Sequence, residues 1–348
     1  MEKELIAKKH LSNCEFVKVI LMLLVVFGHS IAFSAPAVNA EDVSKSMYSL
    51  SLVYLWVKFF HVYAFALASG YIFAFKMNGG GYKDIGAFVK NKAVRLLVPY
   101  VAVMFLWIIP MTHPIFPLTK STFVKNYLLG IAPAQVWFLM MLFEVFLIVR
   151  LLWDVMSKKP GMGWFICISL YLIGIFGYVN FPNYFSIWTT CQYVLIFYAG
   201  ARIRTKEEAG EKTITSTVPW FVWILIYCAI YGVYIYSLGK SGEAWFWTQT
   251  LLQAGLRNVG ALMAWSCLQK IGEKFEAKKH KILRFLMYYT MPIYLFHQQI
   301  TYYVRAYGGR LDPWALGLLT FALSTLLALG IGVVLKMWKV TRFLIGEK

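Results

Sequence analysis

Residues 15–30 read EFVKVILMLLVVFGHS, an apolar run that begins with an acid and a lysine and ends with a histidine and a serine. Placing each ionisable side chain in hydrocarbon is costly, so three of them in a segment otherwise suited to lipid need a reason. Lys18 and His29 are separated by about three helical turns, roughly 16 Å along one face. Glu15 falls near the same stripe. The segment is therefore predicted to be a membrane helix whose ionisable stripe faces protein or water.

His29 has two interpretations. A buried histidine can simply hydrogen-bond a neighbouring helix. Imidazole is also the side chain best suited to accept and return a proton near neutral pH. The shared phase with Lys18 and the predicted depth in the outer half of the bilayer favour a functional role.

The composition of the whole chain excludes a soluble globular protein. Of its 348 residues 60% are hydrophobic and only 14% are charged, and the mean hydropathy is +0.62. These values are typical of a polytopic membrane protein, here predicted to be all-α. We predict about ten transmembrane helices, at residues 15–33, 50–75, 96–107, 136–153, 164–177, 187–201, 219–237, 247–268, 285–304 and 316–335.

The net charge of +18 is distributed in a way that predicts topology. With ten spans and both ends of the chain on one side, 25 of the 34 lysines and arginines lie on that side. Cytoplasmic loops carry such an excess, so both termini are predicted to be cytoplasmic. Nucleic-acid binding is not expected, because it needs basic residues gathered on one soluble surface. Six basic residues lie on the other side, namely Lys45, Lys120, Lys125, Lys240, Arg305 and Arg310.

The remaining features predict one membrane domain over residues 1–348. No loop is long enough to fold into a soluble domain of its own, and no internal repeat is visible. Residues 1–12 are polar and basic, so the first span is expected to stay as an anchor. The cysteines show neither a disulfide framework nor metal-ligand spacing, and no metal site is predicted. Nothing in the sequence predicts an oligomeric state.

The second span, KFFHVYAFALASGYIFAFK at residues 58–76, combines a histidine with a turn of small residues. His61 is predicted near the outer end of this span, where it could meet His29 or be solvated. Ala68, Ser69 and Gly70 are explained by close helix packing, and Ser69 could also belong to a site.

The stretch VKNKAVRLLVPY at residues 89–100 places Lys90, Lys92 and Arg95 before the third span. Ordinary flanking by positive residues on the cytoplasmic side explains them. Clustered lysines and arginines at a helix start also suit the phosphates of a nucleotide-bearing cofactor. Lys18 opens its span on the same side, so both basic sets could serve one cytosolic ligand.

Three further ionisable groups lie within predicted spans: Glu144, Arg257 and His297. Glu144 and Arg257 could neutralise each other between helices. His297 is followed by Gln298 and Gln299, and it could line a polar cavity or form an interhelical hydrogen bond.

These segments together resemble the membrane acyltransferase-3 family, bacterial integral-membrane enzymes that O-acylate surface carbohydrates. The first-helix signature of that family is a basic residue, ten intervening residues and a histidine, often within a Gly-His pair. Lys18 and Gly28-His29 fit this spacing. Lysine stands where arginine is more usual, which keeps the charge but removes bidentate pairing.

Four other segments resemble the family in the same order along the chain. FFHVYAFALASGY at 59–71 resembles a Phe-rich run into Ser-Gly-Tyr, and VRLLVPY at 94–100 resembles an Arg-Leu-x-x-Pro-Tyr helix entry. VWFL at 136–139 and MPIYLFH at 291–297 resemble the Trp-Phe-Leu and Ile-Tyr-Leu-x-His elements. Gln135 stands where a histidine is frequent in the family.

The resemblance implies transfer of an acetyl or succinyl group from acyl-coenzyme A to a hydroxyl of an extracellular or lipid-linked polysaccharide. The expected partners are the acyl-coenzyme A co-substrate, the glycan acceptor and the lipid bilayer of a bacterial cell membrane, with no tightly bound cofactor. His29 would act as a base or as a transient acyl carrier. The site residues assigned on this basis are Glu15, Lys18 and His29 for catalysis, Ser69, Tyr71, Lys90, Lys92 and Arg95 for donor binding, and His61, Trp137, Glu144, Arg257 and His297 for the substrate cavity.

The main alternative is a transporter or flippase for a glycan or a small polar solute, whose buried charges would line a path without chemistry. Such proteins more often show broken helices in two related halves, and the sequence shows no such halves. A membrane sensor that only binds a ligand would use the same residues.

Overall fold

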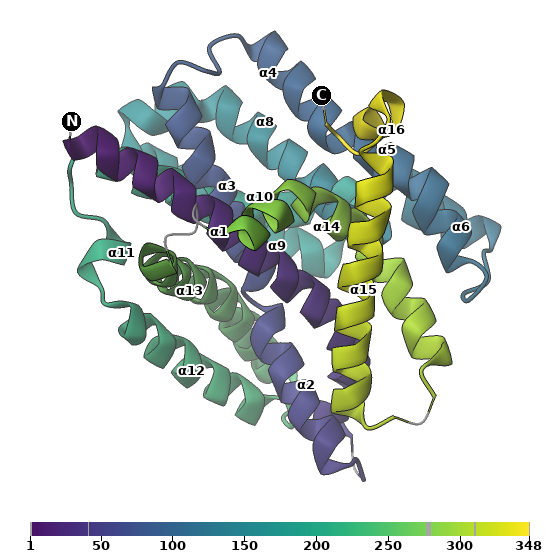
Figure 1. Ribbon diagram of the computed structural model, residues 1–348. Coiled ribbons are helices and arrows are strands. Elements are labelled where there is room, and N and C mark those ends of the chain that lie inside the picture. The colour runs from purple at the N-terminus through teal and green to yellow at the C-terminus, as the bar shows by residue number, and fades with distance from the viewer. Residues whose placement is uncertain (1, 41, 276–279, 310, 348) are drawn as a thin grey trace.

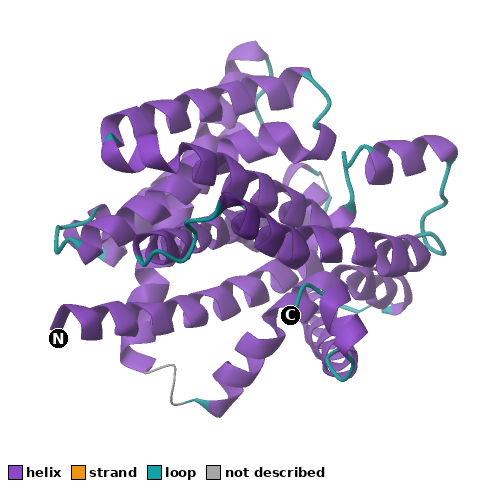
Figure 2. Ribbon diagram, turned by 90° about the horizontal axis from the view of Figure 1, so that it is seen from above, coloured by secondary structure: helices purple, strands orange, loops and turns teal. Residues whose placement is uncertain are grey.

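The computed structural model describes residues 2–40, 42–275, 280–309 and 311–347. This part of the chain is a bundle of helices and contains no strand (Figures 1 and 2). The long helices are α1 (Glu2–Ile31), α2 (Lys45–Lys58), α3 (His61–Asn78), α8 (Trp137–Lys158), α9 (Pro160–Asn180), α10 (Ile187–Glu208), α12 (Trp220–Ser237), α13 (Glu243–Phe275), α14 (Lys281–Tyr307) and α15 (Pro313–Leu335).

Shorter elements connect them. A continuous but irregular helix runs through α4 (Ile85–Lys92), η2 (Ala93–Leu97), α5 (Val98–Val103), η3 (Met104–Ile108) and α6 (Ile109–Thr112). The others are η1 (Ala32–Asn39), α7 (Lys120–Thr122), η4 (Phe123–Leu128), η5 (Ala134–Val136), η6 (Tyr184–Ser186), α11 (Ile214–Thr217) and α16 (Lys339–Leu344).

Seven helical stretches of the described chain are long and apolar enough to cross a membrane, so the protein is a multi-pass membrane protein. They are Asn13–Asn39, Lys45–Asn78, Ile85–Thr112, Ala134–Lys158, Pro160–Asn180, Trp220–Ser237 and Pro313–Leu335. Three more predicted spans coincide with α10, α13 and α14, which fall outside the seven and carry polar side chains such as Gln192, Arg257 and Gln298. The total of ten crossings stays a prediction.

The third and fifth spans are longer than the sequence predicts. The helix predicted at 96–107 extends over Ile85–Thr112, and that predicted at 164–177 extends over Pro160–Asn180. Polar or glycine-containing flanks mark the ends of the apolar runs in sequence, but the backbone continues as helix through them.

Two π-helical turns, η2 and η3, interrupt the helix at 85–112, and each precedes a proline. Proline has no amide hydrogen, so Pro99 cannot bond to the carbonyl of Arg95 in the ordinary helical pattern. That carbonyl faces Gly346, where a Cβ would come within 2.6 Å of the oxygen and where φ is +83°. The turn thus holds Arg95 beside the C-terminal segment, and turns of this kind are frequent at functional sites.

Helices α3 and α10 pack closer than side chains would allow. A Cβ on Gly70 would lie 1.9 Å from the carbonyl oxygen of Phe197, and one on Gly200 would lie 2.0 Å from that of Leu67. Small residues permit this approach. Close packing is therefore the role of Gly70, while the neighbouring Ser69 donates to the carbonyl of Phe65 at 2.9 Å.

The segments that are predicted on one side of the membrane lie together at one end of the bundle, and those predicted on the other side lie together at the opposite end. At the predicted outer end Ser46 donates to Asp312 at 2.6 Å, and the backbone N–H of Phe185 donates to Leu129 at 3.0 Å. At the predicted inner end Arg150 donates to the carbonyl of Tyr82 at 3.0 Å. Figure 1 shows both chain ends in the upper half of the view and the α12–α13 and α14–α15 connections at the bottom.

Which end faces the cytoplasm is a testable prediction. In a cysteine-free background, Lys120→Cys is expected to react with an impermeant thiol reagent added to intact cells, and Lys212→Cys is expected to react only after the membrane is opened. Both positions are exposed, so access alone decides the labelling. The reverse pattern would place the basic end outside and contradict the predicted topology.

Candidate active site

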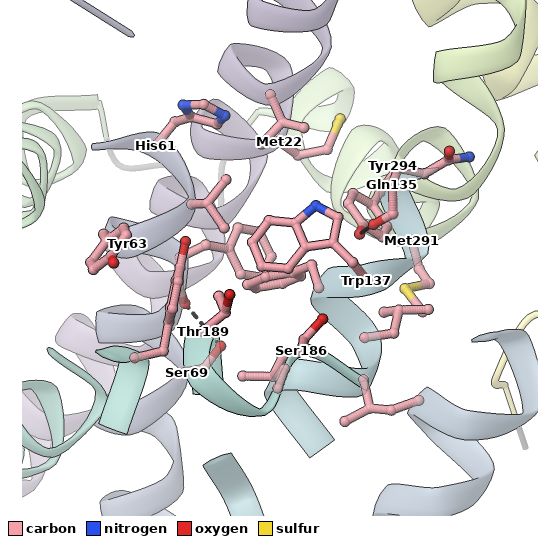
Figure 3. Close-up of a pocket in the computed structure, with 18 of the residues that line it drawn as sticks. Met22, His61, Tyr63, Ser69, Gln135, Trp137, Ser186, Thr189, Met291 and Tyr294 are labelled. Carbon is pink, nitrogen blue, oxygen red and sulfur yellow. Dashed lines mark hydrogen bonds between the residues drawn. The ribbon is translucent and has the colours of Figure 1, made fainter. Parts of the chain in front are cut away.

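A cavity of about 1100 Å³ runs inside the bundle between its two ends. It reaches exposed side chains at the predicted inner end, including Arg95 and Lys76, and at the predicted outer end, including Lys58 and Tyr178. In Figure 3, His61 and Tyr63 lie on one side, Gln135, Tyr294 and Met291 on the other, and the indole of Trp137 projects between them.

Three histidines meet near the outer end of α1. The rings of His29 and His297 have centroids 5.2 Å apart, and a Cβ on Gly28 would lie 3.9 Å from Cε1 of His61. His29 and His61 line the cavity, whereas His297 lies behind His29 and is completely buried. His61 thus lies beside the residue that precedes His29, and His297 approaches His29 from α14.

Hydrogen bonds assign the tautomers of two of these histidines. Nδ1 of His61 donates to the carbonyl of Val57 at 2.8 Å, and Nδ1 of His297 donates to that of Tyr294 at 2.8 Å. In the neutral form Nε2 of each ring is then an acceptor. Nε2 of His297 is buried without a partner among the described residues. His29 has no carbonyl partner in the same part of the chain, and both His29 and His61 line the cavity, so either ring can take up a proton there.

Four cations line the inner end of the cavity. Lys18, Lys76, Lys92 and Arg95 all contribute to the wall there. Lys92 is buried with its Nζ 3.4 Å from the ring centroid of Phe146, while Arg95 is exposed. The acids in this wall are Glu15 and Glu347, and Glu347 pairs with Lys336. We call Lys18, Lys76, Lys92 and Arg95 the basic mouth; its cations outnumber its acids and suit an anionic ligand.

Arg150 holds the loop that covers the basic mouth. Its Nε donates to the carbonyl of Tyr82 at 3.0 Å and its Nη2 to that of Lys83 at 2.9 Å. The ring of Tyr82 lies 5.3 Å from Nζ of Lys92. Burial raises the pKa of Tyr82, so its phenol is a neutral hydrogen-bonding group in the cavity wall.

The charge pair considered from sequence is absent. Glu144 accepts a hydrogen bond from Thr190 at 2.6 Å, and Arg257 donates instead to Gln192 at 3.1 Å. The expected Glu144–Arg257 pair is therefore wrong, because the two side chains point to different partners. Glu15 and Lys18 likewise form no ion pair in the described chain, although both line the cavity.

Nine of the thirteen predicted site residues line the cavity: Glu15, Lys18, His29, His61, Ser69, Lys92, Arg95, Trp137 and Arg257. Four do not. Lys90 is exposed outside the wall, and Glu144 is half-buried against Thr190. Tyr71 is buried with its hydroxyl donating to Glu207 at 2.6 Å, and His297 touches the cavity only through His29.

Several polar residues of the wall were not among the predicted site residues. Gln192 and Gln298 line the cavity from α10 and α14. Gln135 also lines it, and it exchanges amide hydrogen bonds with Gln299 at 2.8 and 3.2 Å. For Gln192 and Gln298 the available signal was a glutamine inside an otherwise apolar span, because a polar side chain there needs a partner or a cavity.

A bundle of apolar helices around a cavity that contains a histidine defines a multi-pass membrane protein with an internal site. The family model described as an acyltransferase domain matches residues 12–337. The chain therefore belongs to the membrane acyltransferase-3 family and is a membrane acyltransferase. The searches of curated proteins and of solved structures gave no match.

Proposed function

We propose that this acyltransferase takes acyl-coenzyme A at the basic mouth from the cytoplasm of a bacterial cell and transfers its acetyl or succinyl group to a hydroxyl of an extracellular or lipid-linked polysaccharide. The observation that carries the proposal is one cavity that reaches both ends of the bundle and holds His29 in its wall. Donor and acceptor can then approach the same imidazole from opposite sides of the membrane.

The basic mouth fits the donor. Coenzyme A carries several phosphate charges, and ammonium and guanidinium groups bind phosphate by charge-assisted hydrogen bonds. Arg95 is exposed at the rim and Lys92 is buried further in, without an acid partner among the described residues. In this arrangement the nucleotide stays at the rim and the acyl-bearing arm extends toward His29.

His29 is placed to act as a general base. It takes the proton of the acceptor hydroxyl, whose oxygen attacks the thioester carbonyl; the new C–O bond forms, the C–S bond breaks, and the thiolate takes up the proton from the imidazolium. Nε2 of His297 can accept the ring N–H of His29 and leave the other nitrogen facing the cavity. An acyl-histidine intermediate would use the same residues.

Mass spectrometry of the cell-surface glycans tests this function. Cells with the gene are expected to carry glycans heavier by one acyl group per modified unit than cells without it, and mild alkali is expected to remove the difference. The mass would distinguish acetyl from succinyl. Identical spectra together with normal amounts of the protein in the membrane would contradict the proposal.

A transporter for a glycan or a small solute is the second candidate, since a cavity that reaches both ends would also serve a substrate path. Release of free coenzyme A separates the two functions. Membranes that contain the acyltransferase are expected to release it from acyl-coenzyme A when acceptor glycan is present, whereas a transporter would release none.

Arg95 provides the test of the donor site. Arg95→Ala is expected to raise the KM for acyl-coenzyme A by about 10-fold to 100-fold with a smaller change in kcat, because a hydrogen bond to a charged group contributes about 1.5–3 kcal/mol. Lys90→Ala is the matched control, since Lys90 lies on the same helical stretch as Arg95 but does not line the cavity. An unchanged KM in well-folded Arg95→Ala would remove Arg95 from the donor site.

A further inference from the structure

We infer that the outer part of the cavity contains a subsite for an anionic sugar, so that the acceptor carries a carboxylate or phosphate group close to the hydroxyl that is acylated. This inference rests on the proposed function and specifies its acceptor. The subsite consists of Lys58, Tyr63, Gln192, Tyr193 and Arg257, which line the cavity together.

The positive charge of this subsite is not balanced by an acid among the described residues. Lys58 and Arg257 both line this part of the cavity. The acids in the cavity wall are Glu15 and Glu347, which belong to the inner end. Within the described residues neither cation has an ion-pair partner, and Arg257 bonds to neutral glutamine oxygens, at 3.1 Å on Gln192 and 3.4 Å on Gln253.

An unpaired cation inside a membrane protein is costly, and most such groups are paired or line a functional path. No carboxylate of the described residues pairs with Lys58 or Arg257, so a ligand that brings an anion gains the interaction that these two cations leave open. Arginine is well suited to this task, because its planar fork matches carboxylate and phosphate oxygens.

Aromatic rings next to Arg257 can receive the rest of the sugar. The rings of Tyr63 and Tyr193 have centroids 4.1 Å apart, and the guanidinium carbon of Arg257 lies 5.8 Å from the ring centroid of Tyr63. Trp137 extends the aromatic wall, with its ring centroid 6.1 Å from that of Tyr193. Binding sites for small molecules commonly combine such apolar faces with a few directed polar groups.

The subsite lies at the depth of His29. Gln192 is in the second turn of α10, counted from the predicted outer end, and it bonds to Arg257. Lys58 is the last residue of α2, three residues before His61, which lies beside Gly28. An anionic group held here would leave a neighbouring hydroxyl within reach of the histidines.

Binding of matched probes to the purified full-length chain tests the inference without requiring acyl transfer. The carboxylate pair is a glucuronate-containing oligosaccharide and its carboxyl-reduced neutral form; the phosphate pair is glucose 1-phosphate and methyl glucoside. Wild type is expected to bind the anionic member of at least one pair about 10-fold to 100-fold more tightly than the neutral member. The preferred pair identifies the anion as carboxylate or phosphate.

Lys58→Gln and Arg257→Gln are each expected to reduce this preference about tenfold, and Arg257→Lys is expected to keep part of it. Lys240→Gln is the matched control, because Lys240 is exposed at the predicted outer end and does not line the cavity. Arg257 also donates to Gln192, so Arg257→Gln can fold poorly for a structural reason. In that case Lys58→Gln tests the anion preference independently.

Equal affinity for charged and neutral probes in wild type, or an unchanged preference in Lys58→Gln and in folded Arg257→Gln, would overturn the subsite. Loss of the preference alone would leave the proposed function standing if coenzyme A release continues. Anion binding that depends on Lys58 and Arg257 without any acyl transfer would overturn the proposed function and leave the anion site in place.

Discussion

His29→Ala is expected to lower the rate of acyl transfer by ~10²–10⁴-fold, the usual loss when a general base is removed. The variant should still insert, purify and bind acyl-coenzyme A, because the basic mouth is formed by other residues. Loss of a hydrogen bond between membrane helices costs only about 0.6–2 kcal/mol of stability. Coenzyme A release and donor binding, measured on the same preparation, separate the two effects.

His280→Ala is the control for this experiment, because His280 is exposed and lies outside the cavity wall. It should keep wild-type activity. If His29→Ala retained near-normal transfer, His29 would be a packing residue, and the mechanism would have to be rebuilt around His61, the other histidine that lines the cavity.

Gly70→Ala and Gly200→Ala are expected to destabilise the protein by about 1–3 kcal/mol each or to prevent its folding. The added Cβ would meet a backbone oxygen at 1.9 or 2.0 Å, and backbone cannot rotate away as a side chain can. Thermal unfolding in detergent and the yield of monodisperse protein measure the effect. Folded protein that remains should keep the wild-type KM, unlike a variant of the donor site.

Gly232→Ala is the matched control, because a Cβ on Gly232 of α12 would meet no neighbouring atom within 4 Å. It should unfold at the wild-type temperature or slightly above, since alanine favours helix over glycine. Equal stability of all three variants would mean that α3 and α10 do not depend on the close contact.

Much of the fold could be predicted from local patterns. Long apolar runs predict membrane helices, and the described helices α1, α8, α9, α12 and α15 overlap predicted spans. The ends were less predictable, because the partly basic stretch at 85–95 and the proline-containing stretch at 108–112 continue as helix. The π-helical turns before Pro99 and Pro110 were also not predictable, since a proline indicates a disturbed helix without specifying its form.

Residues of the candidate site could be predicted where an ionisable side chain would be costly to place in lipid. His29, Lys18 and Arg257 were singled out for that reason, and the structure places all three in one cavity wall. The side chains that these residues contact could not be predicted, because those contacts depend on how the helices are rotated relative to one another. Arg257 therefore bonds to Gln192 and not to Glu144, and His297 contacts His29 and does not line the cavity.

Transfer across a sealed membrane is the most direct test of the central claim that one cavity joins a cytoplasmic donor to an outer acceptor at His29. Purified protein is reconstituted in proteoliposomes of one orientation, with radiolabelled acetyl-coenzyme A supplied only at the basic end and acceptor glycan only at the other. The account predicts label on the glycan, with an equal amount of free coenzyme A on the donor side. Label that reaches the glycan only when both substrates share one side would contradict it.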